Sequence, residues 1–79
     1  MKKLQMKIFG RLTDIFATSE YTLHTQANTV GELRQALEET FPALRGGTYF
    51  IVVANHKASD EQVINERDNI ALLPPYSGG

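Results

Sequence analysis

The segment TVGELRQALEETFP, residues 29–42, decides the fold of this chain. Thr29 and Glu32 have the spacing of a capping box, in which each side chain binds a backbone N–H group at the start of a helix. Pro42 marks the other end, because the residue before a proline avoids the α-helical region. The segment therefore predicts one helix over residues 30–40.

This helix needs a partner layer, because one of its sides is apolar. The apolar side chains share a single helical stripe and are those of Val30, Leu33, Leu37 and Phe41. The polar side chains on the opposite side are those of Glu32, Arg34, Gln35 and Glu38. A stripe of this kind is buried against a sheet or against another helix. The rest of the chain favours a sheet.

Strand patterns lie on both sides of the helix. The predicted strands are residues 4–9, 20–25, 48–54 and 70–73. In the first two, LQMKIF and EYTLHT, apolar and polar residues alternate, and we expect these strands to form a hairpin. The third, TYFIVVA, is β-branched and aromatic enough for a central strand, and IALL closes the fold.

The connections between these elements are predicted to be loops and turns. They are residues 10–19, 45–47, 55–58 and 59–69. In the first, Leu12, Ile15 and Phe16 are available to pack beneath the sheet. In the third, Asn55 and His56 make a tight turn that leads back through a short strand. The last is polar and has room for one helical turn.

The element order is β-β-α-β-β-β, which describes an α+β protein with one helix packed across a mixed sheet. For the helix to bury its stripe, the final strand should lie in the middle of the sheet, parallel to the first. This is the β-grasp, or ubiquitin-like, arrangement. Pro74 lacks the N–H group that a strand ladder needs, so pairing should stop there. We expect a β-grasp domain over residues 1–75 and a flexible tail over residues 76–79.

Composition excludes several classes of function. With 79 residues the chain makes one small domain, and without cysteine it has no disulfide, thiolate metal site or nucleophilic thiol. The net charge of -1 gives no basic surface for nucleic acid or for a membrane. The N-terminus alternates, unlike a signal peptide, and no stretch is long enough to span a bilayer. We expect a cytoplasmic protein that binds neither nucleic acid nor membrane.

The sequence shows no catalytic or metal site. His24 and His56 have no neighbours at ligand spacing, and the acidic residues at 60–61 and 66–68 match no calcium loop. Gly46 and Gly47 lack the lysine of a phosphate-binding loop. We therefore expect no bound metal or cofactor and no enzymatic activity from this chain alone.

The best candidate for chemistry is the end of the sequence, LLPPYSGG. Pro74 and Pro75 favour an extended path that leads away from the sheet. Gly78 and Gly79 have no Cβ, so their backbone fits a channel that is too narrow for side chains. A terminal carboxylate on Gly79 can then reach a nucleotide held by a partner and be activated as an acyl-adenylate.

With these features, the whole chain resembles the small subunit of molybdopterin synthase, a MoaD-type sulfur carrier of the MoaD/ThiS family. The motifs that carry the resemblance are KIFGRLTDIF at 7–16, TVGELRQAL at 29–37, VAN at 53–55 and NIALLPPYSGG at 69–79. The ending Pro-Pro-x-x-Gly-Gly is the most specific of them. Leu73 replaces the phenylalanine that is common before Pro-Pro. Asn55-His56 stands where Asn-Gly is frequent, and Arg67 stands where glycine is usual, so Arg67 is expected at positive φ.

The resemblance implies that the tail carries sulfur. An E1-like adenylating enzyme of the MoeB type would use ATP to adenylate Gly79, and sulfur transfer would give a thiocarboxylate. The loaded tail would insert into a MoaE-type large subunit and donate sulfur to cyclic pyranopterin monophosphate, forming the molybdopterin dithiolene of the molybdenum cofactor. The inserted residues would be Pro74, Pro75, Tyr76, Ser77 and Gly78. Two loaded carriers serve each product, and a heterotetramer of two small and two large subunits is expected.

The resemblance also places a partner interface at Phe9 and Leu73, for which simple burial in the core is the alternative. Three other functions stay open. One is a ThiS-like sulfur carrier for thiamine thiazole synthesis, which shares the Gly-Gly end but is usually shorter and typically lacks the Pro-Pro step. Another is a ubiquitin-like modifier joined to lysines through Gly79. The third is an interaction module with an inert tail.

Overall fold

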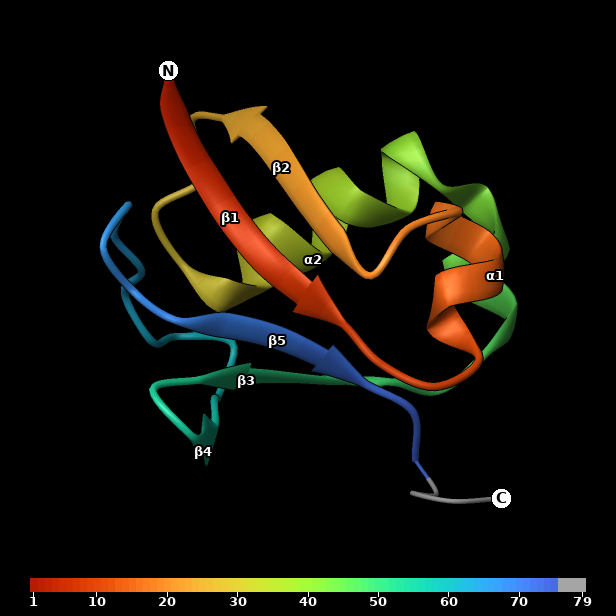
Figure 1. Ribbon diagram of the computed structural model, residues 1–79. Helices are drawn as coiled ribbons and strands as arrows, with labels where there is room; N and C mark the ends of the chain where they lie inside the picture. Colours follow the sequence, from red (N-terminus) through yellow and green to blue (C-terminus); the bar gives the residue numbers. More distant parts are fainter. Residues whose placement is uncertain (76–79) are drawn as a thin grey trace.

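The computed structural model describes residues 1–75 and shows one sheet with a helix packed across it (Figure 1). The strands are β1 (Lys2–Ile8), β2 (Glu20–Thr25), β3 (Phe50–Val53), β4 (His56–Lys57) and β5 (Ile70–Leu73). The helices are α1 (Leu12–Phe16), α2 (Val30–Thr40) and the 3-10 helix η1 (Pro42–Gly46). The strand order is β2-β1-β5-β3-β4, with β5 parallel to β1 and the other pairs antiparallel. The predicted β-grasp fold is confirmed, including the central place of the final strand.

Helix α2 begins as the capping box predicts, with one difference. The Thr29 hydroxyl accepts a hydrogen bond from the backbone N–H of Glu32 at 3.2 Å. The Glu32 carboxylate accepts from the N–H of Asn28 at 2.7 Å, one residue before the cap. The N–H groups of Val30 and Gly31 donate to carbonyl oxygens of the loop before β5, both at 2.9 Å. That loop is therefore part of the helix cap, which the sequence did not indicate.

The core lies between α2 and the sheet. Val30, Leu33 and Leu37 of α2 are completely buried. They form one hydrophobic cluster with inward-facing strand residues, which include Leu4, Met6, Ile8, Ile51, Val53, Ile70 and Leu72. Burial of this apolar surface is the main term that stabilises the fold. Within residues 1–75, α2 covers one face of the sheet and no helix covers the opposite face (Figure 1).

The connection after β1 is loop-like at its two ends, as predicted, but its middle forms the short helix α1, which the predicted element order does not include. Leu12 and Phe16 lie one turn apart and both are buried, as packing beneath the sheet requires. The helix ends at Ala17, which adopts the left-handed conformation with φ 60°. The Phe16 ring lies 4.4 Å from the Phe41 ring and 5.4 Å from the Tyr21 ring, measured between centroids. One helical turn is too short to produce a periodic pattern in the sequence.

Four smaller expectations also need correction. The predicted turn at 45–47 is the end of η1. The tight turn is centred on Ala54 and Asn55, with φ 53° and 69°, one residue earlier than predicted. Arg67 is not among the residues with positive φ. Residues 59–69 form turns without a helical segment, and Ile64 within them is completely buried.

Candidate functional site

Strand β5 leads directly to the predicted tail. Leu73 is its last residue and pairs with Phe50 of β3. Strand pairing stops at Pro74, as predicted. Pro74 is half-buried and Pro75 is exposed. The other predicted tail residues lie outside the described part of the chain, and they are Tyr76, Ser77, Gly78 and Gly79.

The start of the tail packs on the loop between β1 and α1. Gly10 has φ +60°, and a Cβ built on it would lie 2.7 Å from Cγ of Pro74. The backbone N–H of Phe9 donates to the carbonyl of Leu72 at 3.1 Å, which ties this loop to β5. The carbonyl of Gly10 accepts from both the N–H and the hydroxyl of Thr13, at 3.2 Å and 2.8 Å. Pro74 therefore rests on a loop that hydrogen bonds hold on both sides.

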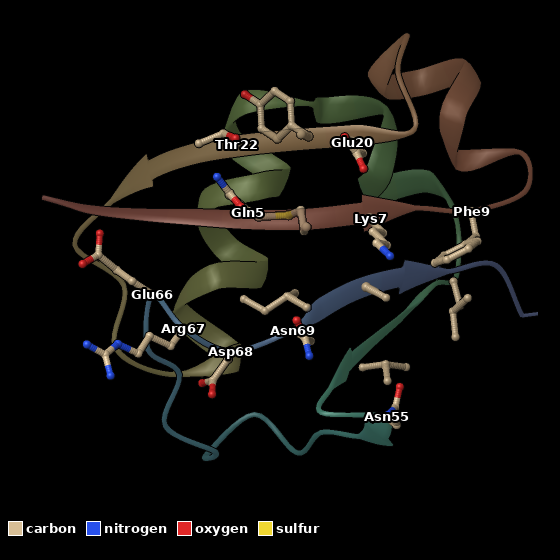
Figure 2. Close-up of a pocket in the computed structure, with 16 residues that line it drawn as sticks. Gln5, Lys7, Phe9, Glu20, Thr22, Asn55, Glu66, Arg67, Asp68 and Asn69 are labelled. Carbon is tan, nitrogen blue, oxygen red and sulfur yellow. The ribbon is translucent and has the colours of Figure 1, made fainter.

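The uncovered face of the sheet carries an apolar patch next to the tail. Side chains alternate between the two faces of a strand, and the register brings Phe50 beside Leu73 and Val52 beside Ala71. Phe9 extends this row from the end of β1, and its side chain is 43% exposed (Figure 2). We call these five residues the apolar patch.

Both residues predicted to contact a partner, Phe9 and Leu73, lie in the apolar patch, and neither belongs to the buried core. Sequence reasoning missed Phe50, Val52 and Ala71. The strands FIVV and IALL are apolar on both faces, so alternation does not show which side chains point away from the helix. Only the pairing register of β3 with β5 reveals this, and the sequence does not show that register.

A depression of about 820 Å³ begins at the apolar patch and has a polar far end. The polar residues that line it include Gln5, Thr22, Asn69, Glu66, Arg67 and Asp68 (Figure 2). The Glu66 carboxylate accepts a hydrogen bond from the backbone N–H of Lys3 at 2.7 Å, which holds the loop before β5 beside β1. The surface therefore offers apolar contacts near the tail and polar contacts farther away.

Two lysines flank the apolar patch. Lys7 of β1 pairs with Ala71 of β5 across the sheet. The ammonium group of Lys57 lies 4.0 Å from the centre of the Phe50 ring, which is a cation–π contact. Positive charges at both sides of an apolar surface suit a partner that combines apolar and acidic groups.

The remaining candidates for chemistry are structural or solvated in residues 1–75. His24 and His56 are exposed, and no three His, Cys, Asp or Glu side chains in this range lie close enough to share a metal ion. Burial, followed by a hydrogen bond to Glu38, raises the pKa of Tyr49, so this phenol stays neutral and serves packing. No helix in the same range is long and apolar enough to cross a bilayer. Among residues 1–75, the apolar patch next to the tail is therefore the strongest candidate for a functional surface.

Comparison with known proteins agrees with this geometry. A model of the ThiS family matches residues 6–79. The structure of a protein from Pyrococcus furiosus assigned as molybdopterin converting factor, subunit 1, matches with a TM-score of 0.84 and 15% identity, covering 96% of this chain and 100% of that one. Small archaeal modifier protein 1 of Haloferax volcanii matches with a TM-score of 0.77 and 24% identity, covering 98% and 99%.

A complex is also among the similar structures. In the complex of subunits 1 and 2 of molybdopterin-converting factor from Helicobacter pylori 26695, one chain matches with a TM-score of 0.67 and 25% identity. The match covers 98% of this chain and 99% of that chain. The family model spans nearly the whole sequence, from β1 through the Gly-Gly motif. The chain belongs to the ThiS family and is a ubiquitin-like sulfur carrier of the MoaD/ThiS type.

Proposed function

We propose that this chain is the sulfur-carrier subunit of a molybdopterin synthase. The observation that carries the proposal is the apolar patch beside the start of a sequence that ends Pro-Pro-Tyr-Ser-Gly-Gly. The likeness to a chain in the Helicobacter pylori complex supports it, because that complex joins subunit 1 to subunit 2. The Pro-Pro step favours molybdopterin synthesis over thiamine thiazole synthesis within the family.

The first step of the proposed cycle takes place on an E1-like adenylating enzyme of the MoeB type. That enzyme binds the apolar patch and holds ATP. The Gly79 carboxylate attacks the α-phosphorus of ATP, which forms the acyl-adenylate and releases pyrophosphate. Sulfide displaces AMP and leaves a thiocarboxylate directly. Alternatively, the terminal sulfur of a persulfide displaces AMP, and a thiol then reduces the acyl disulfide to the thiocarboxylate and is itself oxidised to a disulfide. Because Gly78 has no Cβ, the chain is narrow enough at this position to reach the nucleotide.

The second step takes place on the large, MoaE-type subunit. The apolar patch docks there, and Pro74, Pro75, Tyr76, Ser77 and Gly78 enter the subunit with the loaded Gly79. The thiocarboxylate sulfur bonds to a side-chain carbon of the pterin precursor and replaces an oxygen substituent, which leaves as water or as phosphate oxygen. Water then cleaves the acyl–sulfur bond and restores the carboxylate. A dithiolene contains two sulfur atoms, so two loaded carriers serve each product, which suits a heterotetramer of two small and two large subunits. In this cycle the pterin chemistry belongs to the large subunit, and the small subunit needs no cofactor of its own.

A ubiquitin-like modifier is the second candidate, and the likeness to small archaeal modifier protein 1 favours it. In that function the amine of a lysine attacks the same acyl-adenylate, AMP leaves, and an amide bond joins Gly79 to the target. Both functions use the apolar patch and the tail. The fate of the Gly79 carboxyl group therefore separates them.

Intact-mass analysis of the chain, purified from cells that contain sulfur-transfer machinery, tests the proposal. A carrier should appear heavier than the unmodified chain by the difference between one sulfur and one oxygen atom. The loaded chain should then form dithiolene when it is mixed with the large subunit and the pterin precursor. Conjugates to other proteins without any thiocarboxylate would favour the modifier. A thiocarboxylate that supplies a thiazole but no dithiolene would overturn the molybdopterin assignment.

A further inference from the structure

We propose that Gly10 is a positioning residue for sulfur transfer: its missing side chain makes room for Pro74, and this contact sets the direction in which the tail leaves the domain. The kinetic consequence rests on the proposed function. The contact itself is a property of the fold and is tested separately below.

The geometry leaves no room for a side chain at Gly10. A Cβ on Gly10 would lie 2.7 Å from Cγ, 3.3 Å from Cδ and 3.7 Å from Cβ of Pro74. The shortest of these distances would have to grow by about 0.7 Å to reach an ordinary carbon–carbon contact near 3.4 Å. The atom in the way belongs to a proline ring, which is joined to the backbone at both ends, so it can change its pucker but cannot rotate away like the end of an open side chain.

Gly10 is fixed, so Pro74 is the partner that has to move. Two hydrogen bonds from Thr13 hold the carbonyl of Gly10, and the backbone N–H of Phe9 donates a hydrogen bond to the carbonyl of Leu72 in β5. Gly10 also has φ +60°, a conformation that most residues avoid. Gly47 provides a contrast, because a Cβ built on it would meet no atom within 4 Å.

A small shift at Pro74 grows along the chain toward Gly79. Four residues follow Pro75 in the sequence. Fully extended in a partner, they span about 13–14 Å. A displacement that starts near 0.7 Å at the proline therefore misplaces the reacting carbon by about 1 Å or more, and a misplacement of 1 Å can cost on the order of 100-fold in rate.

Gly10→Asn tests the contact, because asparagine tolerates positive φ and therefore places a Cβ at this position with little backbone strain. We expect kcat for thiocarboxylate formation to fall about tenfold or more. The KM for the carrier should stay unchanged, because the apolar patch is intact.

Gly47→Asn is the matched control and should behave like the parent. Pro74→Ala removes Cγ and Cδ, so Gly10→Asn should lower kcat less than about threefold in that background. An equal loss in both backgrounds would show that the contact does not act through Pro74.

A distance measurement tests the contact without any assay of sulfur transfer. The chain has no cysteine, so Ser77→Cys and Gln35→Cys can carry two spin labels. Gly10→Asn should shift the distance distribution between the labels, whereas Gly47→Asn should not. Pro74→Ala removes the ring atoms that contact Gly10 and adds no strain, so it should also change the distance distribution. This variant replaces Gly10→Asn in the test if Gly10→Asn does not fold. Unchanged distributions would overturn the proposal about Gly10. If the parent chain forms no thiocarboxylate, the proposed function is wrong. The distance measurement then still shows whether the contact between Gly10 and Pro74 sets the direction of the tail.

Discussion

Backbone conformation at single residues limits both the stability and the chemistry of this chain. Among residues 1–75, Ala17, Ala54 and Asn55 have positive φ without being glycine. Asparagine tolerates the left-handed region, whereas the Cβ of alanine lies too close to the following carbonyl oxygen there. The two alanines are therefore places where the sequence is locally in conflict with the fold.

Ala17→Gly should stabilise the protein. Ala17 is exposed and ends α1 with φ 60°, while its N–H donates to the carbonyl of Thr13 at 2.8 Å. Removing the Cβ relieves about 1–2 kcal/mol of strain. The added freedom of the unfolded chain costs about 0.5–1 kcal/mol, so the net gain should be about 0.5–1 kcal/mol. Chemical denaturation measures this, with Ala36→Gly inside α2 as a control that should destabilise by about 0.5–1 kcal/mol. Equal signs for the two variants would contradict this account.

Deleting Gly79, or adding one residue after it, should abolish sulfur transfer and leave the fold intact. One residue of extended chain changes the reach of the tail by about 3.3–3.6 Å, and an error of 1 Å already costs on the order of 100-fold. Gly78→Val should block transfer as well, since its side chain widens the tail. An extra residue before Met1, which is 88% exposed, is the control and should have no effect. Near-parental thiocarboxylate formation by the Gly79 deletion in a reconstituted assay would refute the sulfur-carrier mechanism for this tail.

At the scale of elements, α2 contributes one apolar stripe to the core. Leu37→Ala should destabilise the protein by about 2–5 kcal/mol, because the leucine is completely buried. Val63→Ala is the matched control, since Val63 is 62% exposed, and it should change the free energy of unfolding by less than about 0.5 kcal/mol. Urea titration of both variants gives the comparison. A loss below about 0.5 kcal/mol for Leu37→Ala would mean that the stripe does not support the fold.

Tyr49 joins the segment before β3 to α2 and should make stability fall at alkaline pH. Its hydroxyl donates to the Glu38 carboxylate at 2.9 Å, and the Arg34 guanidinium lies 5.4 Å from the centre of its ring. Burial, together with the bond to Glu38, raises the pKa of Tyr49 in the folded state above its usual value of 10.0. The unfolded chain therefore loses this proton first. The contribution to stability is complete below about pH 10 and declines above it, by up to about 1.4 kcal/mol per pH unit.

Tyr49→Phe tests this coupling between elements. At pH 7 the variant should lose about 1 kcal/mol with the hydrogen bond to Glu38. Between about pH 10 and pH 12 its stability should fall less steeply than that of the parent, since the remaining slope comes from other groups. Parallel stability curves for the two proteins in that range would show that Tyr49 does not contribute.

The elements that the sequence predicted are those with long, capped or strictly alternating patterns. Helix α2 has a capping box and a proline at its ends, and β1 alternates over its whole length. The short helix α1 escaped prediction because a single turn has no period. Ile64 looked like an isolated apolar residue in a polar loop, yet tertiary packing buries it completely and brings that loop onto the start of α2. Within the candidate site, Phe9 was visible from sequence, whereas Phe50 and Val52 depend on strand register.

At the scale of the whole molecule, one helix covers one face of the sheet and the other face stays available for a partner. The apolar patch lies at the end of that face where β5 passes into Pro74 (Figure 2). A partner that covers the patch therefore also receives the start of the tail. In the proposed function this arrangement would couple recognition to delivery, because the domain would dock and the last residues would need to span only the remaining distance.

Phe9→Ala and Leu73→Ala should each weaken binding to the adenylating enzyme and to the large subunit. Truncation of an apolar anchor at the centre of an interface costs more than about 1 kcal/mol, so the Kd should rise about fivefold or more. Phe9→Ala should change the stability of the free protein much less, because the ring is 43% exposed. Val63→Ala is the control, since Val63 is an exposed apolar residue outside the apolar patch. Calorimetric titration of each variant into each partner gives the affinities. Parental affinity for both patch variants, with Val63→Ala weakened instead, would move the docking surface to the loop before β5.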